Sequence, residues 1–337
     1  MSPEPASGGR GKRSRAPAPK GGARGGPKAK GSEAKAAWMK AKDAGAGRGT
    51  RGAAPARTAV RSSVNDRGRG PGGPSDGPVR RGTKVVGLGG DQVEGRQSVR
   101  ELLSAGRRPV ATLLMAEGMD AAEILNDIEA LATRRRVKVE YVSRKRLDAA
   151  ARTDGSQGVV ALAKPIAETP LEDLCQPTKR GRLPFLLILD GITDPHNLGA
   201  VLRSAECAGV TGIVLPRHRS AHLSPTVAKV AAGAIEYLPM ALVAGIPTAL
   251  QQLATLGVAT VGLVGEAQSS LYALPLGDQP VALVLGSEGS GLAALTRRRC
   301  DELAAIPQRG SLSSLNVATA GAIACFDVAR QRSVAVN

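Results

Sequence analysis

The first quarter of the chain lacks the side chains from which a hydrophobic core is made. Residues 1–84 contain no Leu, Ile, Phe or Tyr, and the first leucine is Leu88. Without such side chains, burial of apolar surface cannot offset the conformational entropy that folding removes, about 1–2 kcal/mol per residue for the backbone alone. We therefore predict a disordered tail over residues 1–84 and a folded region that begins near Val85.

The same segment holds most of the positive charge. It has 20 Lys and Arg against 5 Asp and Glu, whereas the whole chain of 337 residues has 46 against 29. Gly-rich basic pieces such as residues 8–13 make it a flexible polycation. Its natural partner is the phosphate backbone of a nucleic acid, which it would bind through counterion release without sequence preference. A solubilising extension without any role in RNA binding is the alternative.

The composition also argues against several classes of protein. No apolar segment of about 7–15 residues follows the basic start, as a secretion signal requires. The most apolar stretch, residues 238–264, is interrupted by prolines, glycines and glutamines, which disfavours a membrane span. His218 and His222 have helical spacing, but no third ligand lies nearby in the sequence, so we do not expect a metal site. The cysteines form no CxxC pair, which favours reduced thiols in a cytosolic protein: Cys175, Cys207, Cys300 and Cys325.

Residues 85–165 are predicted to form a small α/β domain, because helical and strand-like apolar patterns alternate there. Helices are expected over residues 92–104, 121–135 and 144–150. Strands are expected over residues 110–115, 138–142 and 158–163. Residues 166–183, which contain two prolines and a basic run, are expected to be a linker.

The second domain, residues 184–337, begins with the continuous apolar run 185–190, which suits a strand covered on both faces. Similar runs follow at residues 212–215, 259–263, 281–285 and 304–307. Helical stretches separate them at residues 198–208, 225–232, 248–256 and 317–331. This alternation predicts a parallel sheet with helices on both sides, and such sheets bind ligands at the carboxyl ends of their strands.

The first polar segment at such a strand end is residues 190–203. Asp194-Pro195 stiffens a turn, and we expect Asn197 to be the N-cap of a helix that begins near Leu198. Arg203 lies six residues beyond Asn197, which is about 600° around a helix, but its long side chain can reach past the turn. A surface ion pair with Glu206 is the alternative for Arg203.

Two further polar segments follow predicted strands. Residues 286–291 form a Gly-rich loop whose backbone can approach a ligand closely, although a single Gly-rich loop is weak evidence. Residues 306–318 carry three serines and an asparagine between a strand and a helix of small residues. Taken alone, this last segment reads as an ordinary loop with an N-cap.

Together and in this order, the three segments resemble the motifs of the SpoU/TrmH family of RNA ribose 2′-O-methyltransferases, in the SPOUT superfamily. The resemblance rests on Asn197 and Arg203 in the first segment, Glu288 in the second, and Ser314 with Asn316 in the third. It implies an α/β trefoil-knot domain in which the C-terminal segment threads through a loop.

The resemblance covers about residues 183–332, and residues 190–208 look closest to the branch that methylates a guanosine of 23S rRNA. Residues 85–163 resemble the small L30e-like substrate-binding domain that precedes the catalytic domain in rRNA-specific members. One departure lies at residues 155–158, Gly-Ser-Gln-Gly, where relatives often have His before Gln-Gly. The long basic tail is also outside the common pattern.

The resemblance further implies S-adenosylmethionine as the cofactor and a homodimer in which both subunits contribute to each site. The cofactor would be held by backbone groups and apolar contacts at Leu263, Gly286, Ile306 and Leu315. Without the resemblance, plain core packing would be the better interpretation of Ile306 and Leu315. No metal is implied.

The family's proposal assigns activation of the ribose hydroxyl to the arginine of the first motif, here Arg203. Because an arginine side chain almost never loses its proton, a guanidinium that holds the adjacent phosphate and stabilises the developing alkoxide is the easier role. Asn197, Glu288, Ser314 and Asn316 would orient Arg203 and the ribose.

The predicted function is therefore S-adenosylmethionine-dependent methylation of a ribose 2′-hydroxyl in RNA, with a guanosine of 23S rRNA favoured, by a cytoplasmic enzyme. Three alternatives stay open: a tRNA 2′-O-methyltransferase, a base methyltransferase of the same superfamily, and a non-catalytic rRNA-binding or assembly protein. A Rossmann-fold methyltransferase is disfavoured, because residues 190–193 lack its Gly-rich turn.

Overall fold

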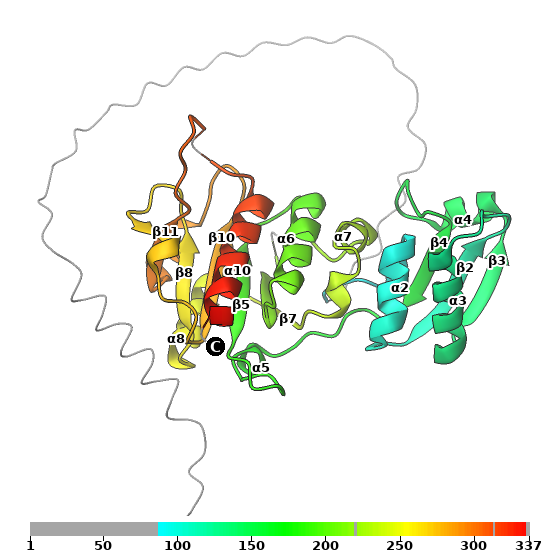
Figure 1. Ribbon diagram of the computed structural model, residues 1–337, viewed down its shortest axis with the longest axis horizontal. Coiled ribbons are helices and arrows are strands. Elements are labelled where there is room, and N and C mark those ends of the chain that lie inside the picture. The colour runs from blue at the N-terminus through cyan, green and yellow to red at the C-terminus, as the bar shows by residue number, and fades with distance from the viewer. Residues whose placement is uncertain (1–86, 219–220, 313, 335–337) are drawn as a thin grey trace, which may run out of the picture.

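The computed structural model describes residues 87–218, 221–312 and 314–334, which form two sheets with their helices (Figure 1). The tail predicted over residues 1–84 lies outside the described residues. Within the described ranges, none of the helices combines the length and the apolar character needed to cross a bilayer.

The N-terminal unit contains a four-stranded sheet in the order β1-β4-β2-β3. Its strands are β1 (Gln92–Glu94), β2 (Val110–Ala116), β3 (Lys138–Val142) and β4 (Val159–Ala163). β2 runs parallel to β3, while β4 is antiparallel to both β1 and β2. The strands β1, β2 and β3 therefore end at one edge of the sheet, where α2 (Arg96–Ala105), α3 (Glu123–Arg135) and α4 (Arg144–Ala150) begin.

The helix predicted over residues 92–104 is wrong at its start. Val93 pairs with Ala161 in the sheet, and the chain turns only at Gly95, whose φ of 93° few side chains tolerate. The helix begins one residue later, at Arg96. Apolar spacing alone did not reveal a strand of three residues.

The C-terminal unit contains a seven-stranded parallel sheet in the order β7-β6-β5-β10-β8-β11-β9, which confirms the predicted fold class. The strands are β5 (Phe185–Asp190), β6 (Gly212–Pro216), β7 (Met240–Val243), β8 (Ala259–Leu263), β9 (Ser269–Ser270), β10 (Val281–Gly286) and β11 (Glu302–Ala305). The helices are α5 (Leu171–Leu174), α6 (Pro195–Cys207), α7 (Pro225–Val230), α8 (Ile246–Thr255), α9 (Ala294–Arg299) and α10 (Val317–Val334), with short 3₁₀ turns η1 (Ala234–Glu236) and η2 (Leu271–Ala273). β7, β9 and α9 were not predicted, and neither was α5, which lies within the residues expected to be a linker and packs the buried Leu171 and Leu174 into a core.

Alternate residues of the central strand β5 enter two different cores. Leu187 and Leu189 pack with the cluster that contains α6, α7 and α10, whereas Leu186 and Ile188 pack with the cluster that contains α5 and α8. Figure 1 shows α6 and α10 side by side over one face of the sheet. Both faces of the strand are therefore buried, which explains its uninterrupted apolar sequence.

The two units meet through α7, which packs against α6 on one side and against β1 and α2 on the other (Figure 1). At this junction Arg108 donates from Nη2 to Oε1 of Glu236 at 2.6 Å and from Nε to Oε2 at 2.9 Å. The side chains of Arg108 and Glu236 are only 8% and 2% exposed. Arg107 lies over the ring of Tyr237, whose hydroxyl donates to Glu101. A buried bidentate ion pair thus connects the two units.

We expect Glu236→Ala to lower the free energy of unfolding by about 3–5 kcal/mol, because it leaves the buried guanidinium of Arg108 without its counter-charge. The exposed pair between Arg217 and Glu168 is also bidentate, through Nη1 and Nη2 of Arg217, and is the control. Arg217→Ala should cost no more than about 1 kcal/mol. Urea denaturation of both variants measures the difference, and equal costs would contradict the role given to the buried pair.

All four cysteines lie in the part of the chain that the structure describes, and all four are free. Burial raises the pKa of the thiols of Cys175, Cys300 and Cys325 to about 12. These three thiols therefore stay protonated at neutral pH and are not poised as nucleophiles or metal ligands.

Candidate active site

The first polar segment opens α6 one turn earlier than predicted, and the prediction that Asn197 is the N-cap is wrong. Asp194 is the N-cap: its carboxylate accepts from the backbone N–H of His196 at 3.2 Å and of Asn197 at 3.1 Å. Pro195 occupies the first helical position. A backbone N–H at that position has no partner within the helix, so the helix loses no hydrogen bond to proline. The side chain of Asn197 is therefore released from capping and can reach other loops.

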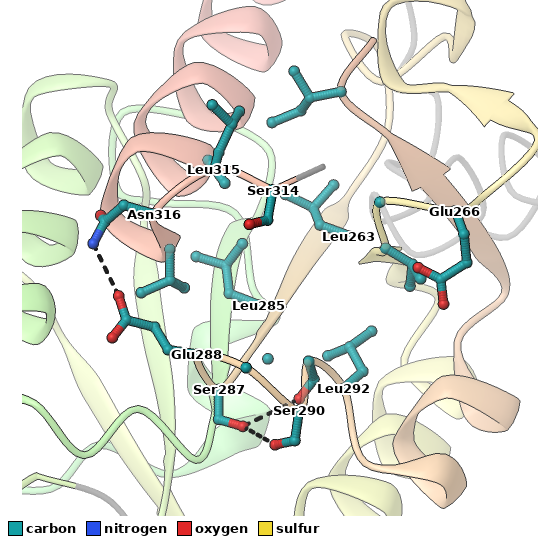
Figure 2. A pocket seen from close by; sticks show the side chains of 18 of the residues that line it. Leu263, Glu266, Leu285, Ser287, Glu288, Ser290, Leu292, Ser314, Leu315 and Asn316 are labelled. Carbon is teal, nitrogen blue, oxygen red and sulfur yellow. Dashed lines mark hydrogen bonds between the residues drawn. The ribbon is translucent and has the colours of Figure 1, made fainter. Parts of the chain in front are cut away.

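Asn197, Glu288 and Asn316 form one hydrogen-bonded group, although each comes from a different polar segment. Asn197 Nδ2 donates to Glu288 Oε1 at 2.7 Å, and Asn316 Nδ2 donates to the same oxygen at 2.9 Å. Asn316 Nδ2 also lies 2.9 Å from Asn197 Oδ1. Figure 2 shows the bond between Asn316 and Glu288 at the side of the cavity described below. The structure thus brings the three predicted segments together at one point.

Asn316 also caps a helix, and this contact fixes the orientation of its side chain. Its Oδ1 accepts from the backbone N–H of Ala318 at 2.8 Å and of Thr319 at 3.3 Å, as an N-cap of α10 does. Because the oxygen is used by the helix, the amide nitrogen must point away from the helix, toward Glu288. Helix capping therefore positions the donor that holds the carboxylate.

The Gly-rich loop after β10 folds back on itself in a tight turn. Ser287 and Gly291 exchange backbone hydrogen bonds, with N–O distances of 3.1 and 2.9 Å, and the hydroxyls of Ser287 and Ser290 lie 2.6 Å apart. A Cβ atom on Gly286 would lie 2.1 Å from the carbonyl carbon of Gly291. Position 286 therefore requires glycine.

A cavity of about 650 Å³ opens at the carboxyl ends of β8, β10 and β11 (Figure 2), within the size range of small-molecule sites. Its apolar wall includes Leu263, Leu285, Leu292, Ile306, Leu315 and Val317. Its polar groups include Glu266, Glu288, Arg297, Gln308, Ser314 and Asn316. The position of the cavity agrees with the expectation that ligands bind at strand ends.

All but two of the predicted site residues line this cavity: Leu263, Gly286, Glu288, Ile306, Ser314, Leu315 and Asn316. Asn197 does not line it but is bonded to Glu288 and Asn316, which do. Arg203 does not line it either.

Arg203 lies two turns further along α6 than Asn197, and its side chain is exposed. Within the described part of the chain it makes no hydrogen bond and no ion pair, so the alternative pair with Glu206 is not formed. Its guanidinium is therefore available to a group outside the residues that the structure describes.

Two residues that were not predicted, Glu266 and Arg297, form an ion pair at the rim of the cavity with an Nη1–Oε1 distance of 2.7 Å. A backbone hydrogen bond within Glu266 and then the guanidinium of Arg297 lower the pKa of the Glu266 carboxyl. Glu266 follows β8 by three residues, so the rule of strand ends would have found it. Across the described ranges, no cluster of three or more His, Cys, Asp or Glu could hold a metal ion.

The chain is similar to two protein families and to individual known proteins. Residues 184–326 match the SpoU rRNA Methylase family, and residues 92–169 match the family described as RNA 2′-O ribose methyltransferase substrate binding. The 23S rRNA (guanosine-2′-O-)-methyltransferase RlmB of Shewanella oneidensis is 42% identical over 248 residues, which cover 72% of this chain and 98% of that protein. The enzyme of the same name from Escherichia coli K12 is 40% identical over 245 residues, covering 72% and 99%.

A solved structure, an AdoMet-bound rRNA methyltransferase from Sinorhizobium meliloti, matches with a TM-score of 0.57 at 25% identity. The match covers 71% of this chain and 86% of that one.

Proposed function

The chain belongs to the SpoU rRNA methylase family, and from this membership we infer that it is an S-adenosylmethionine-dependent RNA methyltransferase. It methylates the ribose 2′-hydroxyl of a guanosine in 23S rRNA. The observation that carries this inference is the match over nearly the whole length of the RlmB relatives. The cavity at the strand ends supplies a place for the cofactor beside Asn197, Glu288 and Asn316.

The residues around the cavity fit S-adenosylmethionine. Leu263, Ile306 and Leu315 offer apolar contact to an adenine ring, and the close turn at Gly286 brings backbone groups to the cavity wall. We propose these four residues as the cofactor-binding set. When bound, the cofactor supplies an activated methyl group on a positively charged sulfur.

The protein must place a ribose oxygen in line with that methyl group, at about 3–3.5 Å. We propose that the hydrogen-bonded group of Asn197, Glu288 and Asn316, with Ser314 beside it, orients the ribose at the mouth of the cavity. Because Glu288 already accepts from two amides, its carboxylate is held in one position before RNA arrives. Such prior positioning lowers the entropy cost of reaching the transition state.

Arg203 is proposed to hold the adjacent phosphate and to stabilise the charge that develops on the 2′-oxygen. Since Arg203 is exposed and does not line the cavity of its own chain, we propose that it acts on the cavity of a second copy. A homodimer that packs through α6 and α10 would allow this. The exposed ring of Phe326 on α10, 50% accessible, supports an interface there. Light scattering should give twice the chain mass of 34.5 kDa.

The roles of the domains and the location of the enzyme belong to the same proposal. We propose that residues 85–165 bind the RNA substrate and that residues 184–337 form the catalytic domain. Residues 166–183 connect the two, with α5 of this segment packed into the core of the second unit. A trefoil knot and an L30e-like first domain stay predictions; the return of α10 against β10 and α6 is compatible with the knot. The enzyme is proposed to be cytoplasmic and metal-independent, with residues 1–84 adding affinity for RNA.

The test is methylation of unmodified 23S rRNA and of tRNA transcripts by the purified protein with S-adenosylmethionine carrying a labelled methyl group. Nuclease digestion and mass spectrometry should show 2′-O-methylguanosine in the 23S rRNA. Label on tRNA would favour the tRNA alternative, and label on a base would favour a base methyltransferase. Cofactor binding without methyl transfer to either RNA would contradict the proposed activity.

A further inference from the structure

A second cavity, of about 480 Å³, lies in the N-terminal unit, far in sequence from the catalytic segments. Its lining consists of Arg96, Gln97, Ile124, Arg144 and Gln157, without any carboxylate. Arg96 and Arg144 are the first residues of α2 and α4, which begin where β1 and β3 end. This is the edge of the sheet at which α/β units place ligands.

Gln157 is held in the cavity by contacts that leave its amide nitrogen available. Its backbone lies in the left-handed region, with φ of 53°, which costs free energy for a residue with a side chain. Arg96 stabilises this conformation: its backbone N–H donates to Gln157 Oε1 at 2.9 Å, and its Nε donates to the carbonyl of Gln157 at 3.2 Å. With Oε1 occupied, the Nε2 group of Gln157 is free to donate to a ligand.

The buried carboxylate of Glu94 holds the loop that carries Gln157 through hydrogen bonds to its backbone. That carboxylate accepts from the backbone N–H of Arg152 at 2.7 Å and of Thr153 at 3.1 Å, and from Gln92 Nε2 at 2.7 Å. Ser156, the residue that departs from the resembled pattern, is buried and does not line the cavity. The departure at that position therefore leaves the lining of the cavity unchanged.

Lys229, on α7 of the C-terminal unit, places a positive charge beside the same loop. A Cβ atom on Gly155 would lie 2.2 Å from Nζ of Lys229, and one on Gly95 would lie 3.7 Å from Cγ of Lys229. Among the residues that the structure describes, neither Lys229 nor Arg96 has an ion-pair partner. Arg144 pairs with Asp148 at 3.3 Å, but both side chains are more than half exposed, so the pair is weak.

Two guanidinium groups and a free amide donor thus line one cavity, a third cation lies at the loop beside it, and no carboxylate is among the lining residues. We propose that this cavity binds a backbone phosphate of the rRNA substrate, away from the ribose that is methylated. Guanidinium groups and amide donors match phosphate oxygens, and contacts to phosphate fix the register of a nucleic acid on a protein. Because the Arg108–Glu236 pair joins the two units, a phosphate held here sets the position of the RNA relative to the catalytic cavity.

The inference rests on the proposed function for the identity of the RNA, and Arg144→Gln tests it in the full chain. Arg146→Gln is the matched control, because Arg146 lies on the same helix, is equally exposed and does not line the cavity. Binding of both variants to an unmodified 23S rRNA transcript is measured by filter binding at several salt concentrations. Arg144→Gln should weaken binding about tenfold and reduce the slope of log K against log salt by about one, whereas Arg146→Gln should behave as the native chain.

A second variant, Gln157→Glu, keeps the side-chain shape and the acceptor for Arg96 but places a negative charge in the cavity. It should weaken RNA binding at least as much as Arg144→Gln and raise the KM for RNA without changing kcat. Loss of affinity with an unchanged salt slope would mean a base contact and would overturn the phosphate assignment, as would equal behaviour of the two arginine variants. If the native chain methylates 23S rRNA and these differences are absent, the cavity inference alone fails. If no RNA is methylated but the differences persist, the proposed function fails alone.

Discussion

Gly286→Ala is expected to lower the affinity for S-adenosylhomocysteine, the product form of the cofactor, by about tenfold to a hundredfold. The added methyl group would lie 2.1 Å from the carbonyl carbon of Gly291 and 2.3 Å from the backbone nitrogen of Leu292. Both atoms belong to the backbone of the turn, so a side-chain rotation cannot relieve the clash. The turn must move, and with it one wall of the cavity.

The fold itself should survive this change, because β10 is held along its length by β5 and by β8. Isothermal calorimetry measures the affinity, and circular dichroism during heating reports on the fold. Gly245→Ala is the control: a Cβ atom there meets nothing within 4 Å, and Gly245 lies at the start of α8, away from the cavity. Unchanged affinity in Gly286→Ala would mean that the turn does not form part of the cofactor site.

The strands of the second sheet were predictable because burial leaves a local signature. The segment 185–190 is apolar throughout since alternate side chains enter two cores, and the structure places β5 over those residues. The same holds for β8, which matches the predicted range 259–263. From these strands, the rule that ligands bind at carboxyl ends was enough to place the cavity.

The first turn of α6 was not predicted correctly, because two good N-capping residues compete there. Asp194 and Asn197 are both residue types that favour the N-cap, and Asn197 was the one predicted. The proline at position 195 was the deciding signal, since proline is favoured at the first position of a helix, directly after the cap.

The second cavity was not predictable from the sequence, because only the packing of separate elements brings its residues together. Gln157 and Lys229 belong to different units, and the junction of the two units brings them to one loop. The partner of Arg108 is equally distant, since Glu236 lies 128 residues away along the chain. Local patterns predict elements, whereas contacts between units depend on how whole elements pack.

Arg203→Ala is expected to lower kcat for methylation by about 10²–10³, because it removes a positive charge from a transition state in which negative charge develops on oxygen. Folding and the affinity for S-adenosylhomocysteine should be unchanged, since Arg203 is exposed and does not line the cavity. Single-turnover kinetics with 23S rRNA measure the rate of the chemical step. Glu206→Ala, which removes the alternative ion-pair partner, should leave that rate unchanged.

The proposed homodimer allows a mixing experiment that decides whether Arg203 serves its own cavity or that of the partner subunit. Chains that carry Gly286→Ala have a damaged cofactor cavity but keep Arg203, while chains that carry Arg203→Ala keep the cavity. If Arg203 acts across the interface, a dimer of one chain of each kind assembles one complete site, and refolding an equal mixture should restore about a quarter of the native activity. If Arg203 acts within its own chain, no site in any dimer is complete, and the mixture should be as inactive as each variant alone. A mixture without recovered activity would therefore contradict catalysis across the interface, even where both single variants behave as expected.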